Sequence, residues 1–296
     1  MQNTIVQRAQ KLAATQDFQS FLAPAKINLF LHITGRRENG YHTLQSVFQL
    51  LDYYDTLKLK PNKIGEIKRI NTIEGVPETE DLCVRAAAAL QQATGSTMGV
   101  EYTIVKRIAM GGGLGGGSSD AATMLLALNQ LWQLNLSRKK LMEIGLSLGA
   151  DVPVFIFGEN AWADGVGEEL TAIVLKPSYY VVLTPAVHVA TRDIFANSTL
   201  TRDTKPLKIA DFSRVGNSDV YGNDLEAVVC KEFPAVATTL KWLSQYGRAR
   251  MSGSGASVFL AVNSKQEADA IFAQKPADVT GFVAKSLSRH PLFGFA

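Results

Sequence analysis

The chain has 296 residues, with 30 lysine and arginine residues against 27 aspartate and glutamate residues, which leaves a formal charge of +3. A hydrophobic fraction of 46% and a charged fraction of 19% are typical of a globular protein and exclude general disorder. The small charge, with no cluster of Lys and Arg along one face, argues against a nucleic-acid partner, so we expect local geometry to hold any anionic ligand.

The N-terminal residues and the cysteines indicate the cellular compartment. Residues 1–21 are predicted to form an N-terminal extension, for which a poorly ordered tail is favoured over a short amphipathic helix. This segment lacks the continuous apolar stretch of a signal peptide, and the whole sequence contains no run of 18 apolar residues. The two cysteines, Cys83 and Cys230, stand in no paired motif, which fits a reducing compartment. We therefore expect a cytoplasmic protein with no membrane partner.

A first lobe is predicted for residues 22–170. Strands are expected at residues 27–34, 43–51, 56–60, 66–74 and 100–108, with a short apolar strand at 152–157. Helices are expected at residues 81–94, 118–132 and 137–149. Gly95 and Gly149 are typical helix ends, and Ser137 is a plausible cap. A turn-rich stretch at 162–170 closes the lobe.

A second lobe is predicted for residues 171–296. Strands are expected at residues 179–183, 256–262 and 280–285. Helical segments are expected near residues 191–197, 222–232 and 235–246, with another helix from Ser264. Strands and helices mix without regular alternation, which predicts the α+β class in two lobes with a boundary near 165–178. The sequence does not predict an oligomeric state.

A glycine-rich loop stands between a predicted strand and a predicted helix, where residues 110–122 read MGGGLGGGSSDAA. Glycine leaves main-chain N–H groups accessible and accepts positive φ, so such a loop can wrap a polyanion. The following helix start adds unpaired N–H groups, and Arg107 adds positive charge nearby. A flexible linker is the alternative, but linkers seldom separate a strand from a capped helix. The predicted phosphate-binding residues are Lys106, Met110, Gly111, Gly112, Gly113, Leu114, Gly115, Gly116, Gly117, Ser118 and Ser119.

Two familiar phosphate motifs do not fit this loop. Gly111, Gly113 and Gly116 satisfy G-x-G-x-x-G, but the dinucleotide fold needs a strand after the next helix, and a second helix is predicted there. A Walker A loop needs Lys after its last glycine, where this chain has Ser118. The loop is therefore of a third kind.

Three separated segments resemble the motifs of the GHMP small-molecule kinases. They are residues 24–29 (PAKINL), the glycine loop, and residues 251–258 (MSGSGASV). Residues 40–43 (GYHT) and 149–155 (GADVPVF) narrow the resemblance to the branch that phosphorylates a cytidine diphosphate-linked methylerythritol in isoprenoid precursor synthesis. The similarity runs from about residue 22 to residue 286.

The resemblance implies a fold, a reaction and cofactors. The fold is a two-lobe GHMP kinase, with an N-terminal lobe like ribosomal protein S5 domain 2 and a ferredoxin-like C-terminal lobe. The reaction transfers the γ-phosphoryl group of ATP to the 2-hydroxyl of the small-molecule acceptor. Mg²⁺ is expected to ride mainly on the ATP phosphates and water, with no protein carboxylate identified as its ligand.

The resemblance also implies that Lys26 and Asp151 form the catalytic pair and that Asn28 positions the methylerythritol end. The residue types agree, because phosphoryl transfer needs alignment, charge neutralisation and one group to receive the hydroxyl proton. We expect Lys26 to open the first strand and Asp151 to lie between a helix and a strand. The lysine charge would then keep the carboxylate ionised. An ordinary ion pair is the alternative.

A cytosine pocket is implied as well. Tyr41 and Phe195 are expected to sandwich the ring, His42 to hydrogen-bond its polar edge, and Phe48 and Thr191 to line the same pocket. Stacking of a base on an aromatic ring contributes about 1–3 kcal/mol per base. Simple core packing is the alternative for Phe48 and Phe195.

Some positions and rival functions remain open. Asp81 stands where many relatives have Asn, and a carboxylate cannot donate a hydrogen bond to adenine. Asp120 stands where some relatives have Asn, and it could order a water on Mg²⁺ or simply favour the helix N-terminus. The loop at 252–255 is expected to brace the glycine loop, with a plain hairpin turn as the alternative. The rival functions are a sibling kinase acting on homoserine, mevalonate or a sugar, and a nucleotide-binding protein without chemistry.

Overall fold

The computed structural model describes residues 17–38, 40, 42–210, 212 and 221–296. Residues 1–16 of the N-terminal extension predicted at 1–21 and the predicted cytosine contact Tyr41 lie outside the described residues, whereas residues 19–21 already belong to the first strand. Among those described, no helix is long and apolar enough to cross a membrane.

The helices and strands follow one another as a mixed α+β chain. The first part contains β1 (Gln19–Arg36), β2 (His42–Asn62), β3 (Ile67–Arg69), the 3₁₀ turn η1 (Glu78–Glu80), α2 (Leu82–Thr94), β4 (Gly99–Val105), α3 (Gly116–Leu131), α4 (Arg138–Leu148), α5 (Val152–Phe157), β5 (Ala161–Asp164) and β6 (Glu169–Ala172). The second part contains β7 (Tyr179–Pro185), α6 (Thr191–Ala196), α8 (Glu226–Glu232), α9 (Pro234–Leu243), β8 (Arg250–Met251), β9 (Val258–Val262), α10 (Lys265–Ala273), β10 (Val279–Leu287) and the 3₁₀ turn η2 (Phe293–Phe295).

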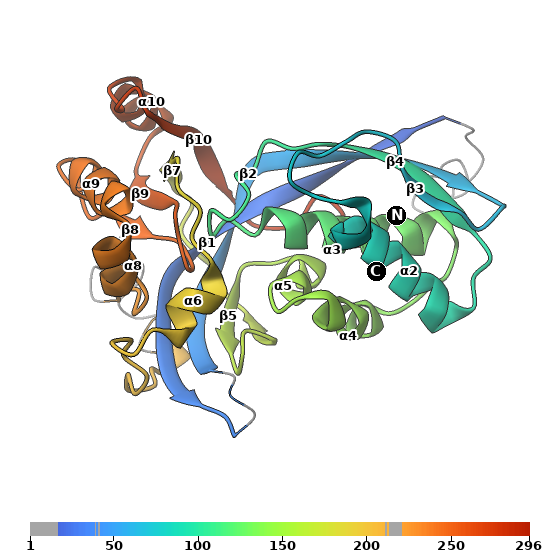
Figure 1. Ribbon diagram of the computed structural model, residues 1–296, viewed down its shortest axis with the longest axis horizontal. Coiled ribbons are helices and arrows are strands. Elements are labelled where there is room, and N and C mark those ends of the chain that lie inside the picture. The colour runs from blue at the N-terminus through green and yellow to red at the C-terminus, as the bar shows by residue number, and fades with distance from the viewer. Residues whose placement is uncertain (1–16, 39, 41, 211, 213–220) are drawn as a thin grey trace.

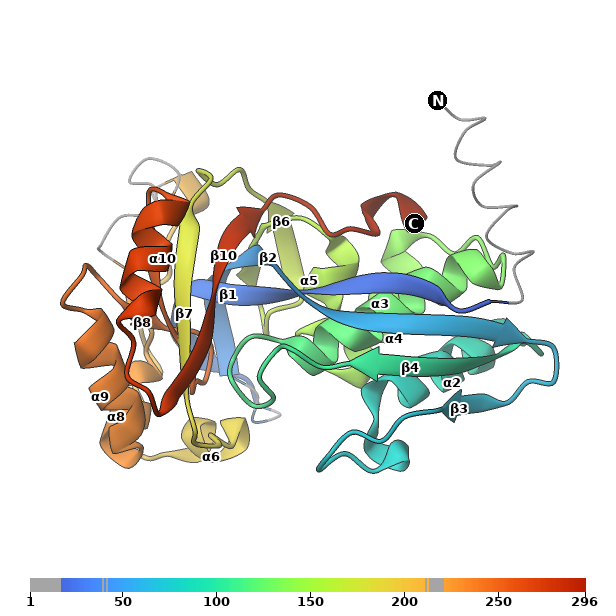
Figure 2. The ribbon, with the colours of Figure 1, turned by 90° about the horizontal axis from the view of Figure 1, so that it is seen from above.

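A long antiparallel pair, β1 with β2, joins the two halves of the molecule (Figure 1). The sheet runs in the order β3-β4-β2-β10-β7-β9-β8, and β1 pairs with β2 off this path. Strand β10 pairs with β7 along most of its length and with β2 at Ser286 and Leu287, which makes the sheet continuous. Figure 2 shows α8, α9 and α10 gathered on one half and α2, α3 and α4 on the other.

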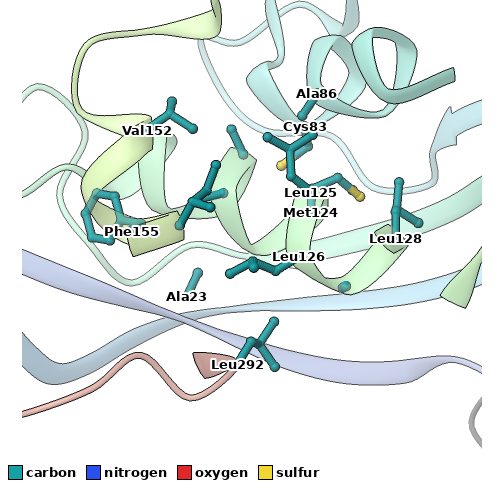
Figure 3. Close-up of a cluster of buried hydrophobic side chains, with 14 of the residues drawn as sticks. Ala23, Cys83, Ala86, Met124, Leu125, Leu126, Leu128, Val152, Phe155 and Leu292 are labelled. Carbon is teal, nitrogen blue, oxygen red and sulfur yellow. The ribbon is translucent and has the colours of Figure 1, made fainter. Parts of the chain in front are cut away.

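Helix α3 is the centre of the first hydrophobic core. Its sequence is apolar nearly all round, as expected for a helix covered on every side, and 13 of its 16 residues are buried. Figure 3 shows its side chains Leu125 and Leu126 between Ala86 of α2, Phe155 of α5 and Ala23 of β1. A second core lies under α8, α9 and α10.

The predicted end of α2 at Gly95 and the predicted cap of α4 at Ser137 are confirmed. Gly95 ends α2 at φ +69°, and Asp81, expected inside this helix, is its N-cap and accepts a hydrogen bond from the Cys83 N–H. Ser137 caps α4 by accepting from the Lys140 N–H. In both helices the side chains buried on one face supply most of the stability, because isolated helices of this length are marginal.

The predicted strand at 152–157 is wrong, because this segment is the helix α5. Five of its six residues are buried, so its sequence (VPVFIF) shows no polar face from which a period could be read. Pro153 in the first helical turn and Gly158 at φ +78° after the last residue are the helix signals that the apolar run concealed.

Candidate active site

A cavity of about 1160 Å³ is lined by residues from both halves of the molecule. The glycine loop between β4 and α3 forms its middle, with α6 to one side and the segment after β3 to the other (Figure 2). The predicted site residues that line it are Lys26, Asn28, His42, Phe48, Lys106, Met110, Gly111, Gly112, Gly113, Gly115, Gly116, Gly117, Ser118, Asp151, Thr191 and Phe195. The side chains of Leu114 and Ser119 are fully buried.

The glycine loop is held by main-chain contacts from two other elements. The Lys26 N–H of β1 donates to the Leu114 carbonyl at 3.0 Å, and the Ser257 N–H donates to the Gly112 carbonyl at 3.1 Å. The Ser252 hydroxyl donates to the Gly113 carbonyl at 2.9 Å. The loop at 252–255 therefore braces the glycine loop as well as turning between β8 and β9.

Glycine is required at Gly113 for two reasons. Its φ is +74°, and a Cβ there would lie 2.1 Å from the Ser252 carbonyl oxygen. The loop thus packs directly on the brace, and α3 begins immediately after it with Gly115 as its N-cap. Free N–H groups at the start of this 16-residue helix are oriented for phosphate oxygens.

Lys106 is held by two buried carboxylates, Asp55 and Asp120. The ammonium lies 2.5 Å from Asp120 Oδ2, and Asp55 also accepts from the main-chain N–H groups of Arg107 and Ile108. Burial and the nearby Asp55 carboxylate raise the pKa of Asp120 to about 8, although Lys106 opposes the shift. Sequence reasoning missed Asp55, because β2 also contains Asp52 and several uncharged polar residues, so nothing marked this carboxylate.

The predicted catalytic pair lies beside the loop. Lys26 Nζ and Asp151 Oδ2 are 3.2 Å apart, with 3% of the lysine side chain exposed and 40% of the aspartate. Lys26 lies inside β1 and not at its start, and Asp151 precedes the helix α5 and not a strand. Both structural expectations were wrong, yet a rigid strand and the start of a helix bring the two groups together.

Lys26 makes three polar contacts in this pocket. Its ammonium donates to Asn28 Oδ1 at 2.7 Å and to the Gly113 carbonyl at 3.3 Å, and it forms the ion pair with Asp151 Oδ2 at 3.2 Å. The Phe48 ring lies 5.3 Å from the ammonium, which adds a cation–π contact. Phe48 therefore sits next to the catalytic pair as well as lining the cavity.

At the α6 side of the cavity, the His42 and Phe195 rings lie with their centroids 5.3 Å apart. Arg202 donates from Nε to His42 Nε2 at 3.0 Å, and its other nitrogens bind main-chain carbonyls around the end of α6. Burial, then Arg202, then Arg36 lower the pKa of His42 below its ordinary value. A neutral ring that accepts at Nε2 carries its proton on Nδ1. Arg202 gave no sequence signal, because the ring that it contacts, His42, lies far away in the chain.

Thr191 joins this side of the cavity to the brace. Its hydroxyl lies 2.6 Å from the Ser254 hydroxyl, so the start of α6 is tied to the loop that supports the glycines. The start of α6 and the glycine loop therefore share one support, the loop at 252–255.

The opposite side of the cavity is an apolar slot that sequence reasoning did not find. Its walls come from an irregular segment, from the start of α2 and from β4, so no single period marks them; they are Ile73, Val76, Leu82 and Ile104. Beside it, Asp81 accepts from Tyr102 at 2.7 Å, Arg69 at 2.8 Å and the Cys83 N–H at 2.8 Å. These three hydrogen bonds use the Asp81 carboxylate to fix the wall of the slot.

Oxygen donors suited to a hard cation lie beneath the glycine loop. Ser119 Oγ and Asp120 Oδ1 are buried without a hydrogen-bond partner. Serine and carboxylate oxygens are ligands that Mg²⁺ accepts alongside phosphate oxygens and water. Within the described part of the chain, no group of three or more His, Cys, Asp or Glu side chains could hold a metal alone.

Models of the GHMP kinase family match both halves of the chain. The GHMP kinases N terminal domain matches residues 81–159, and the GHMP kinases C terminal domain matches residues 206–276. Together with the two-lobe fold and the braced glycine loop, these matches define a GHMP small-molecule kinase. The predicted fold is confirmed.

Similar proteins indicate which branch of the GHMP kinases this chain belongs to. A 4-diphosphocytidyl-2-C-methyl-D-erythritol kinase of Burkholderia ambifaria is 54% identical over 289 residues, which cover 96% of this chain and 99% of that protein. A crystal structure of 4-(cytidine 5'-diphospho)-2C-methyl-D-erythritol kinase is 34% identical, with a TM-score of 0.75, and covers 91% of this chain and 99% of that one. The chain belongs to the 4-diphosphocytidyl-2-C-methyl-D-erythritol kinase family. The mevalonate kinase of Methanococcus jannaschii, 15% identical with a TM-score of 0.67 over 93% of this chain and 99% of that one, shares the fold.

Proposed function

We propose that this kinase transfers the γ-phosphoryl group of ATP to the 2-hydroxyl of 4-diphosphocytidyl-2-C-methyl-D-erythritol, in non-mevalonate isoprenoid precursor synthesis. The observation that carries the proposal is the 3.2 Å contact between Lys26 and Asp151 in the same cavity as the braced glycine loop. The relatives that share 54% of their residues over nearly the whole chain support the acceptor. Two cysteines without disulfide partners support a cytoplasmic location.

The residues divide the work of phosphoryl transfer. Main-chain N–H groups of residues 111–119 hold the ATP phosphates, and the apolar slot takes the adenine. The acceptor oxygen forms a bond to the γ-phosphorus while the bond to the bridging oxygen breaks and its electron pair leaves with ADP. Asp151 receives the hydroxyl proton, and Lys26 stabilises the charge that develops on the reacting oxygens.

Mg²⁺ fits this arrangement as a cofactor carried by ATP. Ser119 and Asp120 are the protein groups that would contribute oxygens to it. When bound, the ion supplies neutralisation of phosphate charge. Ionisation of Asp120 would be favoured by such a cation, which offsets the burial that raises its pKa.

A coupled ADP-release assay tests the proposed function. The purified chain is given ATP and Mg²⁺ with the cytidine-linked acceptor, with mevalonate or with homoserine, and each arm is repeated in EDTA. We expect ADP release with the cytidine-linked acceptor alone and its loss in EDTA. Turnover of mevalonate or homoserine instead would assign a sibling kinase, and ATP binding without turnover of any acceptor would indicate a silent binding protein.

Phe195→Ala is expected to raise the KM of the acceptor by about 5- to 150-fold, which corresponds to the loss of about 1–3 kcal/mol of stacking on cytosine. The KM of ATP should stay within about twofold, because α6 lies away from the adenine slot. Phe272→Ala on α10 is the matched control, since that ring is also half-buried but lies outside the cavity lining. A rise confined to the KM of ATP would refute the cytosine assignment. The same experiment applies to Tyr41→Ala.

Arg202→Gln is expected to make use of the acceptor depend on pH. In the parent enzyme His42 stays neutral as pH falls through 6.5, because burial and the cations Arg202 and Arg36 lower its pKa. Without Arg202 the pKa rises but stays below 6.5, because burial and Arg36 still lower it, so kcat/KM for the acceptor should begin to decline at a higher pH in the variant than in the parent. Parallel pH profiles for parent and variant would contradict the assignment. The profile for ATP serves as the internal control.

A further inference from the structure

A β-bulge in β1 lies next to the catalytic lysine. Asn28 pairs with Phe48 and Leu31 pairs with Ser46, so two residues of β1 face one residue of β2 between these pairs. A bulge of this kind takes main-chain groups out of the ladder. The two carbonyls at the bulge find side-chain donors: Arg250 donates to the Leu29 carbonyl at 2.8 Å, and Ser46 donates to the Phe30 carbonyl at 2.6 Å.

A buried chain of hydrogen bonds runs from the lysine to this bulge. Lys26 donates to Asn28 Oδ1 at 2.7 Å, Asn28 Nδ2 donates to Ser46 Oγ at 2.8 Å, and Ser46 donates to Phe30. The exposed fractions are 3% for Lys26, 4% for Asn28 and 0% for Ser46. Water therefore offers these three side chains little alternative pairing.

The direction of every bond in this chain is fixed by its ends. An ammonium can only donate and a peptide carbonyl can only accept. The Ser46 hydroxyl donates its one proton to the Phe30 carbonyl, so toward Asn28 it can only accept. It therefore accepts a hydrogen bond from the amide NH₂ group of Asn28. The amide oxygen of Asn28 is then forced to face Lys26. With the amide turned over, two donors would face each other and Lys26 would lose its shortest contact.

We propose that Ser46 is a positioning residue for phosphoryl transfer, which locks the amide of Asn28 and through it aims Lys26 at Asp151. The proposal rests on the proposed function. Ser46 is fully buried near the start of β2, is not among the residues that line the cavity, and acts through Asn28, which is. The bulge makes this arrangement possible, because it leaves the Phe30 carbonyl free to accept from Ser46, and that bond sets the direction of the other hydrogen bonds.

Ser46→Ala is expected to lower kcat by about 5- to 150-fold, which is the range for leaving one buried partner unsatisfied. The KM values of ATP and acceptor should stay within about twofold. Ser46→Thr keeps the hydroxyl on a residue type that suits a strand and should restore kcat to within about threefold. Thr239→Val is the matched control, because it removes a buried hydroxyl on α9, where the partner is the Ala235 carbonyl, and should leave kcat unchanged.

A double-mutant cycle separates this role from general support of the strand. If Ser46 acts through Asn28, Ser46→Ala should have no further effect on kcat in an Asn28→Ala background. Multiplying effects would overturn the proposal. So would a Ser46→Thr variant that folds but is as slow as Ser46→Ala.

The side-chain amide resonances of Asn28 give a readout independent of turnover. In the ligand-free enzyme one of its two protons should exchange slowly with solvent, and this protection should be lost in Ser46→Ala. Rapid exchange of both protons in the unmutated enzyme would overturn the proposal even if Ser46→Ala fails to fold. If the enzyme turns over no cytidine-linked acceptor but keeps the protected proton, the proposed function fails while the lock between Ser46 and Asn28 stands.

Discussion

Asp151→Asn is expected to lower kcat by about 10²- to 10⁴-fold, the usual range for loss of a general base. Asparagine has nearly the same shape as aspartate, so the acceptor should still enter and the KM values should change little. The amide cannot receive the hydroxyl proton, however, and it offers Lys26 a neutral partner in place of a charge at 3.2 Å. Steady-state kinetics at saturating ATP and acceptor give the result.

Asp269→Asn is the matched control for this change. Asp269 is a half-exposed aspartate paired with Lys265 at 2.6 Å on α10, outside the residues that line the cavity. Its replacement should leave kcat within about twofold. Near-normal turnover in Asp151→Asn would remove Asp151 from the base role, and an effect carried entirely by the KM of the acceptor would reassign it to binding.

The fold was predictable where the signal was local. The cap at Ser137 and the glycine after α2 are readable because both act within a few residues of the helix that each bounds. The segment at 152–157 failed because burial on all sides erases the contrast between apolar and polar faces on which periodicity depends. Lys26 was wrongly placed at a strand start for a related reason, since β1 continues through residues whose polarity is mixed.

The candidate site was also predictable only where its signals are local. Glycines in a loop before a helix can be read as a phosphate site from backbone chemistry alone. The pairing of Lys26 with Asp151 came from the family resemblance, because no spacing rule connects residues so far apart in the chain. Residues that act on other residues gave no signal: Asp55 under Lys106, Ser46 under Asn28 and Arg202 behind His42. The positions of such supporting residues depend on strand register and on contacts between the lobes, and these exist only in the folded chain.

Asp120 lies in a buried site where Lys106 stands between two acids. Burial and Asp55 still raise the pKa of Asp120 to about 8. Burial therefore disfavours the charged form of this carboxyl at the place where the phosphates of ATP are expected to bind.

Lys26→Met is expected to lower kcat by about 10²- to 10³-fold, comparable to removing a donor that stabilises transition-state charge. Methionine matches the length and the apolar stem of lysine, so the packing against Phe48 is kept. Breaking a buried ion pair usually destabilises a fold strongly because the remaining charge stays unpaired. Here the remaining partner, Asp151, is 40% exposed and can be hydrated, so the melting temperature should change by only a few degrees.

Lys26→Arg tests whether Lys26 acts through its positive charge alone or also through the close packing of its side chain. It keeps the positive charge, but the guanidinium is a wide planar fork and the lysine pocket is narrow. A Cβ added at Gly115 would already lie 3.1 Å from Lys26 Cε and 2.8 Å from the Phe155 ring, which shows how closely the stem is enclosed. We therefore expect Lys26→Arg to be nearly as slow as Lys26→Met. Recovery of most of the activity by arginine would mean that Lys26 supplies charge alone, and that its aim by Asn28 at 2.7 Å is unimportant for the reaction.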